Sequence, residues 1–199
     1  MKYKKLILIV IALMIAGCTS QIKEVKKANG NSKTCIYFKD FDMQNYHASF
    51  SDLTNSKNDN AKIIIAREKD NYYYETKGTR NQIIIQKNNV KYILNPDSRT
   101  YFVADESNNI TSEILPQDIE GLKTSGYEMS DEKISGYNYY YEKYKDNDKE
   151  TTYYFKGKKL CYIRVKSKNN EMFLKVDFIN KKVDSKIFDK EKTYEQKTY

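Results

Sequence analysis

The sequence predicts a mainly β protein built as an antiparallel meander with little helix. Short segments rich in Ile, Tyr, Val and Phe recur along the chain, spaced by about 8 to 12 residues, and turn residues separate them. β-branched and aromatic side chains favour strands, whereas Gly, Asn, Asp and Pro favour tight turns. Together the segments predict about ten strands with hairpin connections.

Six expected strands precede residue 105 and four follow residue 136. They are 45–52, 61–68, 72–76, 82–86, 90–95, 100–104, 137–145, 151–156, 160–166 and 171–179. In the turn after residue 95, Pro96 suits the second position of a type I turn because its ring fixes φ. Residues 107–136 predict a loop with a short helix opening near Pro116, where the missing N–H has no helical partner to lose. The charged tail from Asp189 onward is expected to fray.

The amino terminus has the order of a secretory leader. Basic residues at 2, 4 and 5 precede an uncharged apolar run at 6–15, which is shorter than the roughly 20 residues of a membrane span. The tetrapeptide that ends at Cys18, Ile-Ala-Gly-Cys, resembles the lipobox of bacterial lipoproteins. That resemblance implies a diacylglycerol on Cys18, cleavage before it, and a domain held at the extracytoplasmic face of the cell envelope. Two acyl chains suffice for stable anchoring.

The organisation expected from these features has four parts. Residues 1–17 are the leader, 18–33 the lipidated terminus and a polar tether, 34–190 a single domain, and 191–199 a charged tail. Removing the leader, which contains three lysines, lowers the formal charge from +8 to +5. The basic excess is interleaved with acidic residues and forms no stripe with aromatics, so the sequence gives no indication of a nucleic-acid partner.

Two cysteines remain inside the expected domain, Cys35 and Cys161. In an oxidising compartment an even pair is compatible with a disulfide. Two buried free thiols on separate strands are an equally consistent interpretation.

Several strands are apolar on both faces. Ile63 and Ile65 point to one face and Ile64 to the other, and the run 83–85 behaves alike. A sheet with one wet face alternates more cleanly, so both faces need cover or a ligand. A packed interior and a cavity both satisfy this pattern. If a cavity exists, the candidate wall residues are Ile63, Ile65, Ile84, Tyr92 and Tyr101.

Signals for catalysis or metal binding are nearly absent. The single histidine, His47, lies in an expected strand, where a structural role is the common one. The match of 130–133 to Ser-x-x-Lys lacks its companion motifs. The acidic stretch 146–150 opens like a calcium loop but has Thr151 and Gly157 where glycine and a bidentate carboxylate are needed. The expectation is therefore a non-enzyme without cofactor or metal. The 19 tyrosines are explained by strand propensity, or by a tyrosine-lined binding surface.

The order of strands and turns resembles the LolA/LolB-like superfamily of extracytoplasmic lipoprotein-sorting proteins. The segments that carry the resemblance are 46–50, 61–67 with 72–74, 90–96, 100–102 and 173–178 followed by 183–188. The resemblance covers most of 36–190 and implies an incomplete, curved β-barrel around an apolar cavity lidded by short helices. It transfers no individual binding residue to this sequence.

The expected function is a membrane-anchored lipoprotein that binds a lipid, an acyl chain or a lipoprotein segment in the concavity of the half-barrel. The alternative is an envelope interaction or sensor module that contacts a partner protein while its own side chains fill the interior. The volume of the interior distinguishes the two.

Overall fold

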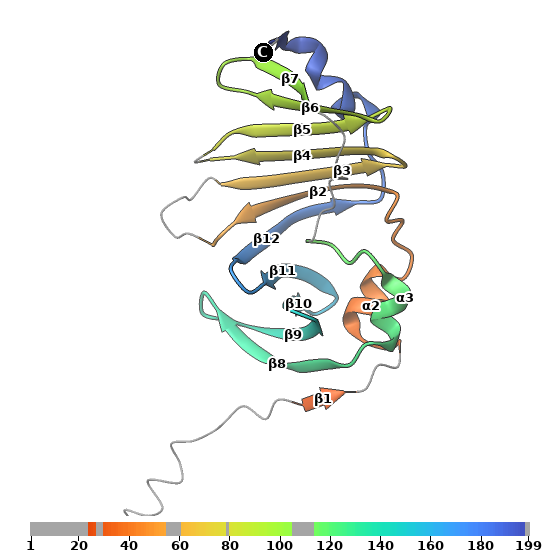
Figure 1. Cartoon of the computed structure of the whole chain (residues 1–199). Helices are drawn as coiled ribbons and strands as arrows, with labels where there is room; N and C mark the ends of the chain where they lie inside the picture. The colour runs from red at the N-terminus through yellow and green to blue at the C-terminus, as the bar shows by residue number, and fades with distance from the viewer. Residues whose placement is uncertain (1–23, 27–29, 55–60, 79, 105–113, 198–199) are drawn as a thin grey trace, which may run out of the picture.

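The structure is a computed structural model that describes residues 24–26, 30–54, 61–78, 80–104 and 114–197. Thirteen strands of this described part form one sheet in the order β1-β8-β9-β10-β11-β12-β2-β3-β4-β5-β6-β7-β13. Neighbouring strands are antiparallel except for β13, which runs parallel to β7. Figure 1 shows that the sheet curls without closing on itself. The predicted fold class, a mainly β incomplete barrel with short helices, is confirmed.

The elements have the following bounds. The strands are β1 (Glu24–Lys26), β2 (Asn45–Asp52), β3 (Lys62–Glu68), β4 (Asn71–Lys77), β5 (Gln82–Lys87), β6 (Val90–Asn95), β7 (Thr100–Ala104), β8 (Tyr127–Ile134), β9 (Tyr137–Asp146), β10 (Lys149–Lys156), β11 (Lys159–Lys166), β12 (Glu171–Asn180) and β13 (Glu195–Gln196). The helices are α2 (Lys33–Phe38), α3 (Ile119–Thr124) and the 3₁₀ helix η1 (Ser185–Thr193).

All ten expected strands are present, and the short helix expected near Pro116 is α3. It begins at Ile119, because the Asp118 carboxylate accepts a hydrogen bond from the Gly121 N–H and caps it. The loop expected over 107–136 is wrong at residues 127–134, which form β8. This strand is rich in polar residues, and its pairing with β9 along its full length holds it in the sheet.

The two terminal segments also differ from expectation. Residues 24–26, expected in the tether, pair with β8 as β1. The tail expected to fray forms the end of η1 and the edge strand β13, and the Glu191 side chain is buried. Residues 1–23, which include the leader and Cys18, lie outside the described part.

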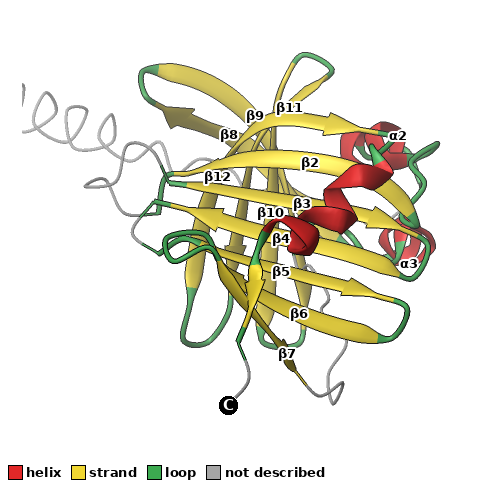
Figure 2. Ribbon diagram, turned by 90° about the horizontal axis from the view of Figure 1, so that it is seen from above, coloured by secondary structure: helices red, strands yellow, loops and turns green. Residues whose placement is uncertain are grey.

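Apolar side chains gather on both faces of the sheet. The largest cluster lies on the inner face of β2, β3 and β8–β12, together with α2 and residues 114–115. A second cluster lies on the outer face of β3–β6, where η1 covers it with Ile187 and Phe188. Figure 2 shows η1 crossing this outer face, with α2 and α3 lying together at one end of the strands. The helix η1 therefore covers the outer face of β3–β6, and the inner face of β2, β3 and β8–β12 is covered by its own packed core.

Candidate functional site

An apolar row crosses the inner face of the sheet between β4 and β7. The strand register places Tyr74 opposite Ile84, Ile84 opposite Ile93, and Ile93 opposite Phe102. We call these four residues the apolar stripe. All four are half-buried. Tyr74 packs against the main core cluster. Among the described residues, Ile84 and Ile93 belong to none of the three apolar clusters, so the stripe extends away from the filled core.

Polar residues flank the stripe on both sides. One neighbouring row runs through Thr76 and Gln82, and the other runs through Tyr72, Gln86 and Lys91. Side chains two residues apart on a strand are about 6.6 Å apart. The stripe is therefore one side chain wide and runs across the strands rather than along them.

The stripe begins beside a hollow of about 440 Å³ at the ends of β2–β5 and β12. Tyr74 belongs to both the stripe and the hollow, and Ile63 and Met172 also line it. The volume falls within the range of about 300–1,000 Å³ typical of small-molecule sites. Lys62 and Lys77 lie at the rim, but their ammonium groups pair with Asp177 and Glu75.

The other half of the inner face is filled. Phe38 of α2 packs edge-on to Phe41 and Tyr153, and Tyr37 packs against Phe155. Ile163 and Leu174 beneath them are fully buried. The interior is thus packed over β8–β12 and retains an apolar surface over β4–β7.

A buried carboxylate, Glu142, holds α2 in place. Glu142 is only 1% exposed. Its carboxylate accepts hydrogen bonds from the backbone N–H groups of Lys33 and Thr34, both at 2.8 Å. The Thr34 hydroxyl donates at 2.7 Å and the Tyr140 hydroxyl at 3.0 Å. Such charge-assisted bonds offset the cost of burying the carboxylate. Burial, together with the nearby Glu142 charge, raises the pKa of the Tyr140 phenol.

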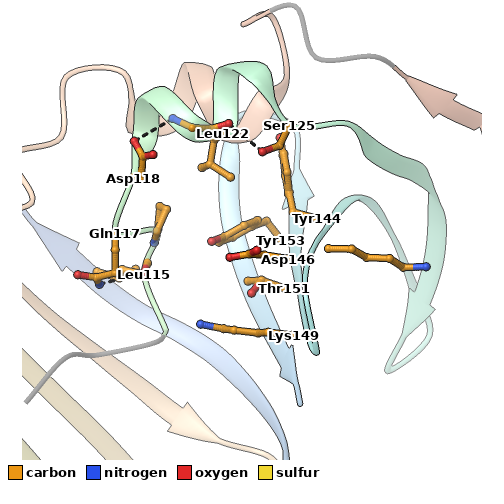
Figure 3. A pocket seen from close by; sticks show the side chains of 13 residues that line it. Leu115, Gln117, Asp118, Leu122, Ser125, Tyr144, Asp146, Lys149, Thr151 and Tyr153 are labelled. Carbon is orange, nitrogen blue, oxygen red and sulfur yellow. Dashed lines mark hydrogen bonds between the residues drawn. The ribbon is translucent and has the colours of Figure 1, made fainter. Parts of the chain in front are cut away.

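A second hollow of about 390 Å³ lies beneath α3. Figure 3 shows Leu122 of α3 above Tyr144 and Tyr153, with Thr151 and Lys149 along β10. Burial raises the pKa of the Tyr153 phenol. The hollow has aromatic residues below and polar and charged residues around its rim.

The outer face behind the stripe is clamped by η1. Lys87 of β5 donates hydrogen bonds to Asp189 at 2.8 Å and to Glu191 at 2.7 Å. Burial alone would lower the pKa of Lys87, but these two carboxylates hold it above its ordinary value. Lys190 donates to the Tyr73 hydroxyl at 2.6 Å, and Tyr73 donates to Glu75 at 2.7 Å. The stripe therefore lies on strands that are fixed from behind.

The five expected wall residues do not line one cavity. Ile63 and Ile65 are buried on the inner face within the main core, and Ile84 belongs to the stripe. Tyr92 and Tyr101 lie on the opposite, outer face and pack against the cluster beneath η1. The expectation that these two tyrosines line an inner cavity is wrong, because the register pairs Tyr92 with the outer residue Ile85.

The other singled-out residues have structural surroundings. Cys35 is buried in α2, whereas Cys161 is half-buried as the unpaired residue of a bulge in β11, and both are free thiols. His47 packs edge-on against Phe178 on the outer face, and burial with nearby Lys190 lowers its pKa. Residues 130–133 lie in β8, and Asp146 ends β9 with Asp148 in the hairpin turn that follows.

Sequence reasoning missed Ile93, Phe102 and Glu142. Ile93 follows Tyr92 in β6, and Phe102 precedes Val103 in β7, so neighbouring residues point to opposite faces. Choosing the other face of these two strands would have identified Ile93 and Phe102. Glu142 had no signal, because its partners in α2 lie about a hundred residues away and an isolated acid in a strand reads as solvated.

Within the described residues, no three His, Cys, Asp or Glu side chains are grouped to hold a metal ion. None of the helices described is long and apolar enough to cross a membrane. Comparison of the sequence with protein families and with curated proteins finds no match.

Proposed function

We propose that the protein is a membrane-anchored lipoprotein of the cell envelope that binds an acyl chain along the apolar stripe. The stripe is the observation that carries this proposal. The lipobox ending at Cys18 supports the anchor, and the resemblance to LolA/LolB-like proteins supports a lipid-related ligand.

The dimensions of the stripe suit an extended acyl chain. Three inter-strand steps from Tyr74 to Phe102 span about 14 Å at roughly 4.8 Å per step. One leaflet of a bilayer is about 15 Å of hydrocarbon, half of the roughly 30 Å core. A single chain laid across β4–β7 would match the stripe in length, with polar rows on either side. The hollow beside Tyr74 would receive one end of the ligand.

The test is lipid binding by the purified lipidated protein. Native mass spectrometry reports a copurified lipid, and displacement of a fluorescent fatty acid reports affinity. Ile93→Ser should weaken binding about tenfold, because the ligand would lose roughly 1.4 kcal/mol of apolar contact. Val103→Ser on the outer face of β7, where Val103 is 48% exposed, is the matched control and should bind normally.

A second stripe variant, Ile84→Ser, covers the case in which Ile93→Ser fails to fold, and thermal unfolding of each variant reports folding. A clean apo mass without displacement of the fatty acid overturns acyl binding. Equal binding by the stripe variants and the control would show that the ligand does not bind along the stripe.

The second candidate is an envelope interaction module without a small ligand. The packed interior over β8–β12 favours it, because half of the concavity has no room for a ligand. Cross-linking in the native envelope to a protein partner, together with an apo mass, would favour this function.

A further inference from the structure

One end of the molecule is basic and free of acidic side chains in its turns. Lys133 lies next to the turn between β8 and β9. Lys158 lies in the turn between β10 and β11, and Lys156 and Lys159 flank it. Residues 133–138 and 156–160 contain no acid. All four lysines are exposed.

The two turns and the start of α2 meet at this end. Lys156 Nζ lies 4.8 Å from the centroid of the Tyr137 ring, which joins the turns. Lys33 Nζ donates a hydrogen bond to the Gly157 carbonyl at 3.3 Å and lies 4.4 Å from the Tyr140 ring centroid. We call Lys33, Lys133, Lys156, Lys158 and Lys159 the basic tip.

Exposed apolar side chains accompany the lysines. Tyr137 is 62% exposed and Ile36 is 61% exposed, the two highest values among the large hydrophobic residues that the structure describes as exposed. Ile36 follows Lys33 by three residues and therefore shares its face of α2. The nearest acids in β8 are Asp131 and Glu132, and Glu132 is engaged by Tyr154 and Arg164.

The direction of β1 relates the basic tip to the expected lipid anchor. β1 is antiparallel to β8, with Lys26 opposite Tyr127 and Glu24 opposite Met129. Followed toward the amino terminus, β1 therefore runs in the direction of Ile134, the end of β8 near which the basic tip lies. Five residues lie between Cys18 and Glu24, so the extended chain spans at most about 20 Å from one to the other. A lipid on Cys18 would hold Glu24, at the β1 edge of the sheet, within about 20 Å of the bilayer.

We propose that the basic tip is the surface that lies on the membrane, where its lysines contact anionic lipid headgroups. Lysines near an anionic bilayer are attracted to it, and each strengthens association roughly fivefold. Tyrosine is enriched at the membrane interface because its ring has an apolar body and a polar hydroxyl. The inference extends the proposed lipid anchor, but the tip would attract anionic lipid without it. The apolar stripe on β4–β7 would then lie at the end of the sheet order farther from the bilayer.

The experiment measures which end of the full-length lipidated protein lies near the bilayer. A fluorophore is attached at Asn138→Cys in the basic tip or at Ser98→Cys in the turn between β6 and β7, each with Cys161→Ser. Vesicles of phosphatidylcholine, with or without phosphatidylglycerol, carry a headgroup quencher. The probe at residue 138 should be strongly quenched with phosphatidylglycerol and less so at high salt, whereas the probe at residue 98 should stay bright.

Charge variants supply the matched control. Replacing Lys156, Lys158 and Lys159 by Gln should reduce the quenching at residue 138 to the level at residue 98. Replacing the exposed Lys181, Lys182 and Lys186 by Gln makes the same change in net charge and should leave the quenching intact. Equal quenching at both probe sites, or an equal effect of both triple variants, overturns the basic tip as the membrane surface.

Failure of the anchor is separable, because the mass of the amino-terminal peptide reports lipid on Cys18. An unlipidated chain that still binds anionic vesicles through the tip contradicts the anchor and supports the tip. A lipidated chain without quenching at residue 138 contradicts the tip alone. An unlipidated chain that ignores anionic vesicles contradicts both, and fatty-acid displacement tests the stripe independently of all three.

Discussion

At the scale of single residues, the most consequential side chain is one that the sequence does not mark. Glu142 lies in the middle of β9 and accepts bonds from both the backbone and a side chain at the start of α2. A carboxylate only accepts hydrogen bonds, and the groups of Lys33, Thr34 and Tyr140 that bond to it all donate. The start of α2 is therefore fixed by one ionised group whose neighbours match it.

Replacing Glu142 by Gln should destabilise the protein by about 1–3 kcal/mol, because the amide NH₂ would face donors and leave one of them unsatisfied. Urea unfolding measures the change. Glu150→Gln is the control, since Glu150 is part of exposed ion pairs at 3.8 and 3.9 Å and should cost less than about 0.5 kcal/mol. Similar losses in the two variants would contradict the anchoring role of Glu142.

At the scale of elements, the sequence predicts what depends on local pattern. The strands β2, β6 and β7 have the predicted bounds because turn residues mark their ends. The strand β8 is missed because its polar sequence has no strand pattern and depends on β9 for its hydrogen bonds. The helix η1 is missed because its charged side chains look solvated in the sequence. In the structure they form ion pairs with the sheet: Lys87 of β5 pairs with Asp189, and Lys190 of η1 pairs with Glu75 of β4.

The candidate site is predictable only in part. The sequence indicates two apolar faces in β3–β6, and both are present. It does not indicate which face each strand directs inward, because Ile83, Ile84 and Ile85 look alike. The face follows from the register, which long-range pairing decides.

The helix η1 is expected to stabilise the strands that carry the stripe. Phe188→Ala removes a buried ring from the outer cluster and should cost about 3 kcal/mol. Hydrogen exchange followed by mass spectrometry should then be faster in β4 and β5 than in β9 and β10, because η1 contacts only the former strands. Ile36→Ala, at an exposed position, should leave the exchange unchanged. Uniformly faster exchange across the sheet would argue against a local role for η1.

At the scale of the whole molecule, the terminal segments cover the two ends of the sheet. β1 pairs with β8 at one edge, and β13 pairs with β7 at the other. An uncovered edge strand offers unpaired backbone groups to other chains, so such cover opposes association between copies.

A chain that ends at Thr193 should self-associate more than the full chain, because loss of β13 exposes the edge of β7 next to the half-exposed Val103. Sedimentation velocity over a range of concentrations measures this. A chain that ends at Lys197 keeps β13 and is the control. Identical sedimentation of the two truncated chains would show that β13 does not protect the edge.

The ionic contacts of η1 also decide which way β5 faces. A slip of β5 by one residue would exchange Ile84 for Ile83 or Ile85 on the inner face, and apolar contact on both faces would barely change. The same slip would turn Lys87 away from Asp189 and Glu191, so two ion pairs at 2.8 and 2.7 Å would be lost together. The side chain that distinguishes the correct pairing is thus a lysine, and its partners are near the last residues of the chain. The correct register of β5 is therefore favoured over the slipped one only after η1, near the carboxyl terminus, has packed on the sheet.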